Sequence, residues 1–491
     1  MLKLMSKNVY IFKKAFRNPA ILYIVSRYGT YIIKFVNSIF IAAYLGPYYL
    51  GIWGFLNLIL GYIGQINFGI PNSVNVIISI NKKKEDYIRR IIGNGISMIF
   101  LLTGILLVLL LLIQSGSLNF GTKYNFTYYA PAIFVIGVLS HFNTLFTYVI
   151  RVYGKLFAIA VNQSLFPILT ILLIPFYRAH DLLNALVLAN FISTIVSLLL
   201  LIIQIPIKLK PLFNLDLIKL IQKKGIFLFL FNASFNLIMI TTNSFISGNY
   251  SVEEFGYFTF SYTLANVILL LLNAISYIIN PKMLNRFANY KVENIVPILN
   301  DIRISYISLS HFFIHLSIMI FPVFLIFFEK YNQSADAFKI VALTIALYSN
   351  SFGYQGLLIA RNKEKLIGSI SFLALLLNIS ISVVLVYLIK VPFSYVMLAT
   401  TITYFLYSFL SCFFGRKELS LSYKIIATLN DVFPLPMIIP LITSFMLIFL
   451  SAPNIFFVIP FLLYISLNIK DLMGIKNMIV KVIKNPNFIN I

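Results

Sequence analysis

Long apolar runs separated by short polar connections make up almost the whole sequence. Most of these runs are long enough for a helix to cross the hydrocarbon core of a bilayer, which is about 30 Å thick. The pattern predicts an all-α polytopic membrane protein with about 14 transmembrane helices, the second of them tilted or broken near Gly69-Ile70-Pro71. The predicted spans are 21–45, 51–80, 91–114, 127–150, 156–177, 182–206, 225–248, 256–281, 304–328, 338–360, 366–389, 393–414, 433–451 and 454–469.

Basic residues are concentrated in every second connection and at both ends of the sequence. These segments hold 31 Lys and Arg residues, whereas the connections between them hold four: Lys123, Arg178, Lys330 and Lys390. The positive-inside rule therefore places both termini in the cytoplasm. A missed span would reverse every later connection, so the unbroken alternation supports an even number of spans. The outer connections are short, and no extracytoplasmic domain is expected.

The composition indicates that the bilayer is the solvent of this chain. Of its 491 residues, 60% are hydrophobic and 11% are charged, which is more apolar surface than a soluble domain can bury. A formal charge of +24 suggests nucleic-acid binding, but the basic residues lie in short clusters between apolar runs, which excludes it. The single cysteine, Cys412, excludes an internal disulfide and a cysteine-based metal site. No cleavable signal peptide and no cofactor are expected.

The second half of the sequence repeats polar positions of the first half. Positions in the span 21–45 recur 205 residues later in the span 225–248, and from the span 127–150 onward the offset is about 211. The shared offset predicts duplication of a six-helix unit, whose copies are related by an axis along the membrane normal. The alternative is that Asn is common here and some pairs match by chance. The matched pairs are Arg27 with Asn232, Tyr31 with Asn236, Ser38 with Asn243, Gly51 with Gly256, and Asn75 with Asn280.

The duplication predicts two pseudo-symmetric lobes, a linker and a C-terminal extension. An even-numbered unit keeps its orientation, so both lobes begin and end on the cytoplasmic side. The linker is amphipathic and is expected to lie on the membrane surface. The predicted segments are the N-terminal lobe (1–206), the cytoplasmic linker (207–224), the C-terminal lobe (225–415), and helices 13 and 14 with a basic cytoplasmic tail (416–491).

Two cations are the only full charges expected well inside the predicted spans. Arg27 and Lys34 are seven residues apart and share one face of a helix with Tyr31. A charge near the bilayer centre costs about 2.5 to 3.5 kcal/mol, so this face is expected to line a water-filled cavity between the lobes. That cavity would be electropositive and suited to a phosphate or diphosphate. The other predicted substrate-binding residues are Asn75, His141, Asn232, Asn236, Asn243 and Asn280.

Most of these residues also have a structural interpretation. Arg27 lies about two turns from the cytoplasmic end and could snorkel to the headgroups, as Lys339 is expected to do at an outer helix end. A histidine such as His141 more often bonds one helix to another, and the asparagines could do the same. His311 and His315 are assigned a structural role.

Two segments resemble a family of membrane transporters. The stretch "IAAYLGPYYLGIWGF" (41–55) resembles the LGP-x-x-x-G turn of polysaccharide-biosynthesis flippases in the multidrug/oligosaccharidyl-lipid/polysaccharide exporter superfamily. The stretch "SVEEFGYFTFSYTLANVILLLLNAISYIINPKM" (251–283) is similar to the helix 7–8 signature of that family. The resemblance implies lobes that alternate between inward and outward openings. It implies that Arg27 and Lys34 match the family's intramembrane cations, and that the last two helices help to form a groove for a lipid tail.

The resemblance also implies a function, as a flippase for lipid-linked oligosaccharides of the O-antigen type or a related surface polysaccharide. Its substrate would be an oligosaccharide joined through diphosphate to a polyprenyl lipid. This substrate would move to the outer leaflet of the bacterial cytoplasmic (inner) membrane. The implied partners are membrane lipids, a polysaccharide polymerase and chain-length proteins, with no nucleic acid.

Two other functions are left open. A drug/cation antiporter of the same superfamily would bind cationic compounds, which an electropositive cavity disfavours, and would commonly use membrane carboxylates that the predicted spans lack. A membrane glycosyltransferase or polymerase would need catalytic residues in a substantial outer loop, which the predicted topology lacks. The sequence shows no nucleophile–base pair, metal cluster or phosphate loop, so an enzyme is not expected.

Overall fold

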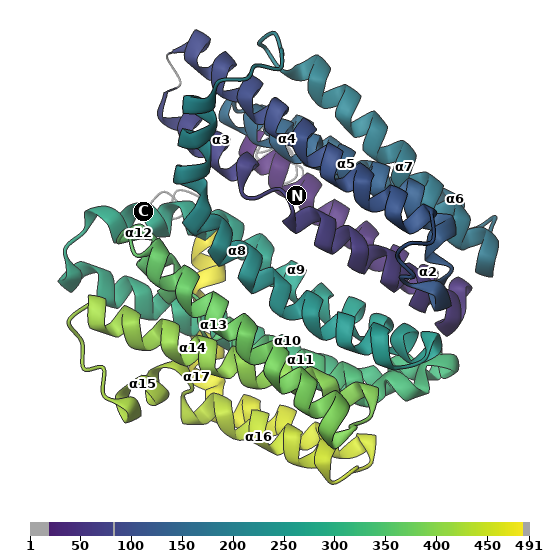
Figure 1. Cartoon of the computed structure of the whole chain (residues 1–491). Helices are drawn as coiled ribbons and strands as arrows, with labels where there is room; N and C mark the ends of the chain where they lie inside the picture. Colours follow the sequence, from purple (N-terminus) through teal and green to yellow (C-terminus); the bar gives the residue numbers. More distant parts are fainter. Residues whose placement is uncertain (1–18, 82–83, 485–491) are drawn as a thin grey trace, which may run out of the picture. The chain divides into compact units, whose positions relative to one another are not determined.

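The structure, a computed structural model, describes residues 19–81 and 84–484, which form helices joined by turns and loops without strands (Figure 1). Ten of the described helices are long and apolar enough to cross a membrane, or eleven if one bent pair counts as a single span. Helices coincide with all fourteen predicted spans, some of them divided by kinks and breaks. The prediction of an all-α polytopic membrane protein is confirmed.

The chain divides into two compact units, Met1–Phe229 and Leu230–Ile491, and the boundary falls inside one helix, α8 (Leu215–Asn249). The other elements of the first unit are α2 (Pro19–Gln65), α3 (Ile70–Ile80), α4 (Glu85–Gln114), η1 (Thr122–Tyr124), α5 (Phe126–Val152), α6 (Leu156–Leu173) and α7 (Ala179–Gln204). Those of the second unit are α9 (Val252–Asn289), α10 (Val292–Ile326), η2 (Glu329–Ser334), α11 (Ala335–Ser349), α12 (Tyr354–Ala360), α13 (Glu364–Val383), η3 (Val384–Ile389), η4 (Phe393–Met397), α14 (Leu398–Glu418), α15 (Ile425–Val432), α16 (Leu435–Phe449), η5 (Asn454–Phe457) and α17 (Val458–Lys484).

The segment predicted as a linker, 207–224, is partly non-helical and partly the start of α8. Residues 205–214 connect α7 to α8 without helical structure, and α8 then continues into the next predicted span. Asn214 caps the helix, because its side-chain oxygen accepts hydrogen bonds from the N–H groups of Asp216 and Leu217 at 3.0 and 3.1 Å. No Pro follows within α8, so the amphipathic segment and the span form one helix.

Helices at equivalent positions of the two units pack in the same pairs. In the first unit α5 packs against α7, α3 and α4, and in the second unit α11 packs against α14, α9 and α10. Likewise α6 packs against α7, and α13 packs against α14. These matched pairs are the arrangement that a duplicated six-helix unit would produce.

Two glycines interrupt helices of the first unit where the sequence predicts turns. Gly46 kinks α2 between the first two predicted spans, with φ 72° and ψ 171°, and Gly69, with φ 72°, precedes α3. A positive φ costs residues that carry a Cβ about 1 to 2 kcal/mol, so glycine suits both positions. The equivalent stretch of the second unit, 271–280, has no Gly or Pro, and α9 runs through it unbroken.

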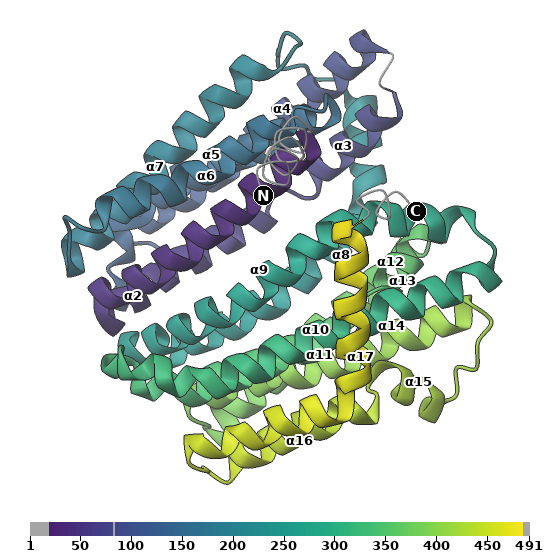
Figure 2. The same cartoon turned by 180° about the vertical axis from the view of Figure 1, so that it is seen from behind.

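The last two predicted spans pack on the second unit rather than forming a separate body. α16 packs against α17 and α11, and α17 packs along α10, which it crosses in Figure 2. Tyr464 of α17 is fully buried, and its hydroxyl donates a 2.5 Å hydrogen bond to the carbonyl oxygen of Ser308 on α10. Asn468 donates a 2.7 Å hydrogen bond to the carbonyl oxygen of Pro436 on α16. Polar contacts therefore fix α17 on both neighbours.

A close helix crossing in the first unit gives a stability prediction. A Cβ added at Gly225 of α8 would lie 1.8 Å from the Oγ of Ser73 and 3.2 Å from the carbonyl oxygen of Gly69. We expect Gly225→Ala to lower the free energy of unfolding by about 1 to 3 kcal/mol, because α8 must move away from α3. Adding Ser73→Ala removes the closest contact and should restore part of the loss, measured as the thermal melting temperature in detergent.

The control for this crossing is Gly248→Ala near the other end of α8. A Cβ at Gly248 meets nothing within 4 Å, so this variant should be neutral or more stable, by up to about 1 kcal/mol of helix propensity. Equal melting temperatures for Gly225→Ala and Gly248→Ala would show that the α3–α8 crossing is not tight.

Candidate functional site

Lys34 is exposed on a side of α2 whose other described positions are buried or half-buried. At about 100° per residue, Thr30 and Asn37 lie within about 60° of Lys34 around the helix. They are only 5% and 4% exposed, whereas Lys34 itself is exposed. Ile32 and Phe40, which are exposed and apolar as lipid-facing residues are, lie about 120° or more away. The ammonium therefore does not share the side of α2 that suits acyl chains.

Hydrogen bonds fix the helix around Lys34. The side-chain amide of Asn37 donates a 2.7 Å hydrogen bond to the carbonyl oxygen of Pro167 on α6. The Ser38 hydroxyl donates to the carbonyl oxygen of Lys34 at 2.8 Å, so this serine is occupied within its own helix. Tyr31, one turn before Lys34, is half-buried. Arg27 lies on α2, but its side chain is outside the described residues.

The three predicted asparagines of α8 lie on one side of that helix. At about 100° per residue, Asn232, Asn236 and Asn243 fall within about 40° of one another, and none of them is buried. Another side of α8 packs into the second unit, where the hydroxyls of Thr242 and Thr400 lie 2.7 Å apart. The packing therefore turns the asparagine side chains away from the core of the second unit.

The other three predicted residues lie in different environments. Asn75 is half-buried on α3. His141 is 2% exposed inside the first unit on α5, and its Nε2 has no hydrogen-bond partner among the described residues. Asn280 lies on α9 with its side chain outside the described residues. Within the described part of the first unit, Lys34 and Tyr31 are therefore the predicted pair that shares one helix face.

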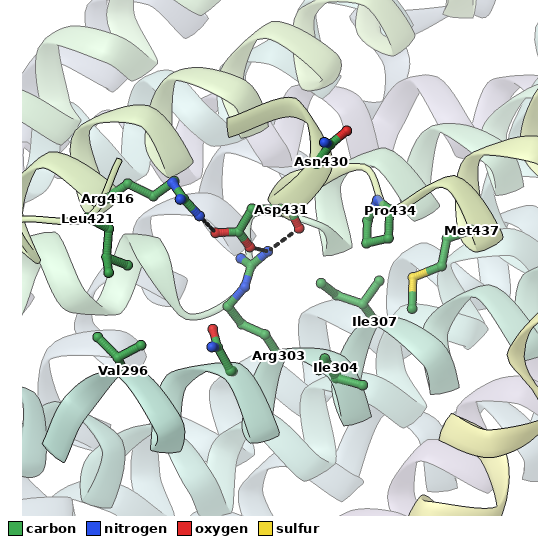
Figure 3. Close-up of a pocket in the computed structure, with 11 residues that line it drawn as sticks. Val296, Arg303, Ile304, Ile307, Arg416, Leu421, Asn430, Asp431, Pro434 and Met437 are labelled. Atoms are coloured by element: carbon green, nitrogen blue, oxygen red, sulfur yellow. Dashed lines mark hydrogen bonds and ion pairs between the residues drawn. The ribbon is translucent and has the colours of Figure 1, made fainter. Parts of the chain in front are cut away.

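The second unit contains a buried ion cluster that the sequence did not predict. Arg303 of α10 is 2% exposed, and its Nη2 donates to Oδ1 of Asp431 at 3.3 Å (Figure 3). Asp431 also pairs with Arg416 of α14 and accepts a 2.5 Å hydrogen bond from the hydroxyl of Tyr354. Arg303 directly precedes the predicted span 304–328 and lies within α10, which begins at Val292.

The ion cluster lines a cavity of about 430 Å³ in the second unit (Figure 3). The cavity reaches the surface, because Asn300 and Asn430 among its lining residues are exposed. Its apolar lining includes Ile307 and Met437, which belong to a buried cluster with Tyr464. The cavity therefore has a polar part around the ions and an apolar part against α10 and α16.

Lys339 also differs from the prediction. It was expected to snorkel, but it is 4% exposed and its Nζ lies 3.1 Å from Oδ1 of Asp336. The same Nζ lies 4.3 Å from the centre of the Phe457 ring. An ion pair and an aromatic face therefore hold this ammonium inside the second unit.

The described residues offer a cation that could bind an anion and amides that could bind hydroxyl groups. Lys34 supplies a cation, and the α8 asparagines supply amide donors and acceptors. Within residues 19–81 and 84–484, no three His, Cys, Asp or Glu side chains come together as metal ligands would.

The helices have the fold of transporters of the MOP superfamily. An inward-facing multidrug resistance MATE family transporter matches with a TM-score of 0.65 at 14% identity, over 81% of this chain and 98% of that chain. The lipid II flippase MurJ, in an inward closed conformation, matches with a TM-score of 0.66 at 16% identity, over 94% of this chain and 100% of that chain. A MOP superfamily transporter from Pyrococcus furiosus matches with a TM-score of 0.51 at 14% identity, over 82% and 96%. No family model and no curated protein matches the sequence.

Proposed function

We propose that the chain, with its MOP-superfamily fold, is a flippase for polyprenyl-diphosphate-linked oligosaccharides. It would move them from the inner to the outer leaflet by alternating access through a cationic central cavity. The observation that carries this proposal is Lys34, a cation exposed on a side of a membrane helix whose other described positions are buried or half-buried. A diphosphate is a group that would offset the cost of holding a cation there.

The extent of the structural matches favours a lipid-linked substrate over a drug. The MATE transporter is matched over 98% of its own length and yet covers 81% of this chain. The lipid II flippase covers 94% of this chain. The longer match supports a relation to flippases, for which the resemblance implies a lipid-tail groove at the last two helices.

The chemistry of the two helix faces also supports an anionic, sugar-bearing substrate. The first predicted span contains Arg27 and Lys34 and no Asp or Glu. In the second unit, Asn232, Asn236 and Asn243 present amides of the kind that hydrogen-bond sugar hydroxyls. A cationic drug would be repelled by the first face, which disfavours the drug/cation antiporter.

In this role the chain would lie in the bacterial inner membrane with both termini in the cytoplasm. Its product would then be available to a polysaccharide polymerase and chain-length proteins on the outer side.

The proposed function can be tested with the purified full chain in liposomes. A fluorescent polyprenyl-diphosphate oligosaccharide is placed in the membrane, and its transfer between leaflets is followed by quenching with a membrane-impermeant reductant. We expect transfer at least tenfold faster than in protein-free liposomes, and little transfer of a polyprenyl-monophosphate sugar, which lacks the second phosphate. Uptake of a cationic dye without lipid transfer would instead support the antiporter.

A further inference from the structure

Two histidines lie inside the second unit, close to the cavity. Arg303, Ile307, His311 and His315 follow one another at intervals of four along α10, so they lie near one face. His311 is 0% exposed and His315 is 1% exposed, and their ring centres are 6.1 Å apart. They are two of only four histidines in the whole sequence.

Each buried imidazole has one nitrogen committed as a donor. The Nε2 of His311 lies 3.0 Å from the side-chain oxygen of Asn350, which can only accept, so this Nε2 carries the hydrogen. Ser444 donates its own hydrogen to the carbonyl oxygen of Pro440 at 3.0 Å. Its Oγ, 3.5 Å from Nδ1 of His315, is therefore left to accept from that nitrogen.

The second nitrogen of each ring carries a lone pair with nothing bonded to it. Neither Nδ1 of His311 nor Nε2 of His315 has a hydrogen-bond partner among the described residues. A neutral imidazole whose other nitrogen is a donor can accept a proton at such an atom. The two nitrogen atoms are therefore basic sites inside the second unit.

The groups that face the pair leave a bound proton without a counter-charge. Arg303 reaches the site from α10, because its Nη1 donates to the backbone oxygen of Asn350, which directly follows α11. Tyr464 of α17 lies beside both rings, and α16 contributes Ser444. Among the described residues of α9, η2, η5 and these helices, no carboxylate pairs with either ring. Burial without a counter-charge disfavours a protonated ring in this packing. Protonation would therefore favour a different packing of these helices, in which the ring meets water.

The cavity lies along the same helix as the pair. Ile307 and Met437 belong to its apolar lining, and the two histidines do not line it. His311 follows Ile307 by one helical turn, about 6 Å along the axis. A small movement of α16 or α17 away from α10 would therefore open the ring nitrogens to the cavity.

We propose that Nδ1 of His311 and Nε2 of His315 form a proton-binding site through which transport is coupled to a pH gradient. The coupling rests on the proposed function. The proton comes from water in the cavity, forms an N–H bond with a ring lone pair, and returns to water when the contact with α16 and α17 rearranges. The site lies within the second unit, separate from the cation of α2.

The test compares the wild type with His311→Gln/His315→Gln in the liposome assay. Gln keeps hydrogen-bonding groups for Asn350 and Ser444 but binds no proton near neutral pH. A gradient of 1 pH unit should change the wild-type initial rate at least threefold in one direction. The initial rate of the double variant should change less than 1.3-fold with the same gradient. Its rate without a gradient should stay within twofold of the wild-type rate. His180→Gln, which removes an exposed histidine, should behave as the wild type.

Several outcomes would overturn the proton site. They are a wild-type rate indifferent to the gradient, an undiminished gradient response in the double variant, and an equal loss in His180→Gln. A wild type that moves no lipid would refute the proposed function instead. The proton site is then judged by titrating the purified proteins in detergent from pH 8 to 4. The double variant should take up fewer protons than the wild type over this range. Equal uptake by the double variant and the wild type would exclude the site.

Discussion

Lys34→Gln is expected to slow transfer of the diphosphate-linked lipid on the order of a hundredfold, which corresponds to about 2.7 kcal/mol. The side chain is exposed on a side of α2 whose other described positions are buried or half-buried, so its ammonium has the access that a substrate contact requires. A charge-assisted hydrogen bond to a phosphate oxygen is worth more than the neutral bond that Gln would make. The readout is the initial rate in liposomes at equal protein content.

Two comparisons separate this effect from misfolding. Lys34→Arg keeps the charge on a longer, planar group and should retain most of the rate, with a loss of about tenfold or less. Lys330→Gln, which removes an exposed lysine of η2, should leave the rate unchanged. A Lys34→Gln protein that elutes as a single folded species and transfers lipid at the wild-type rate would remove the main support for the proposed function.

The spans and their interruptions were predictable because they depend on local sequence. A run of apolar residues must form a helix within a bilayer, where its backbone groups have no water to bond. The turn at Gly46 and the break before Pro71 follow from residues that cannot continue a regular helix. The repeat remains a prediction from the constant offset between polar positions of the two halves.

The ion cluster could not be predicted in this way because its members are distant in sequence. Arg303 and Asp431 are 128 residues apart, and Arg303 fell within a basic connection that the charge pattern assigned to the membrane surface. The sequence did contain one indication, because the stretch from Val292 to residue 304 has no Gly and only one Pro, Pro297. The helix could therefore extend back from residue 304 and include Arg303. The partners of His311 and His315, Asn350 and Ser444, are similarly remote.

For the predicted binding residues, the sequence indicates which helix face a residue occupies but not whether that face is buried. Helical spacing correctly placed Asn232, Asn236 and Asn243 on one side of α8. It could not tell that His141, at a polar position of its own helix, is 2% exposed, because burial depends on which neighbouring helices cover that position.

Asp431→Asn is expected to lower the free energy of unfolding of the second unit by about 3 to 5 kcal/mol. The carboxylate accepts from Arg303, Arg416 and Tyr354, and the Arg303 side chain is only 3% exposed. An amide in its place leaves two guanidinium groups close together without a counter-charge. The thermal melting temperature in detergent should fall on the order of 5 to 10 °C.

A second substitution and a matched control identify the cause. Adding Arg416→Gln to Asp431→Asn removes one of the two uncompensated charges and should recover part of the lost stability, even though it deletes another side-chain contact. Glu418→Gln removes the acid from a more exposed pair, with Lys363 at 3.6 Å, and should cost less than about 1 kcal/mol. If Asp431→Asn/Arg416→Gln melts at a lower temperature than Asp431→Asn, the lost stability comes from missing hydrogen bonds rather than from repulsion between buried cations. In that case hydrogen bonds, more than charge, hold α15 to α10 and α14.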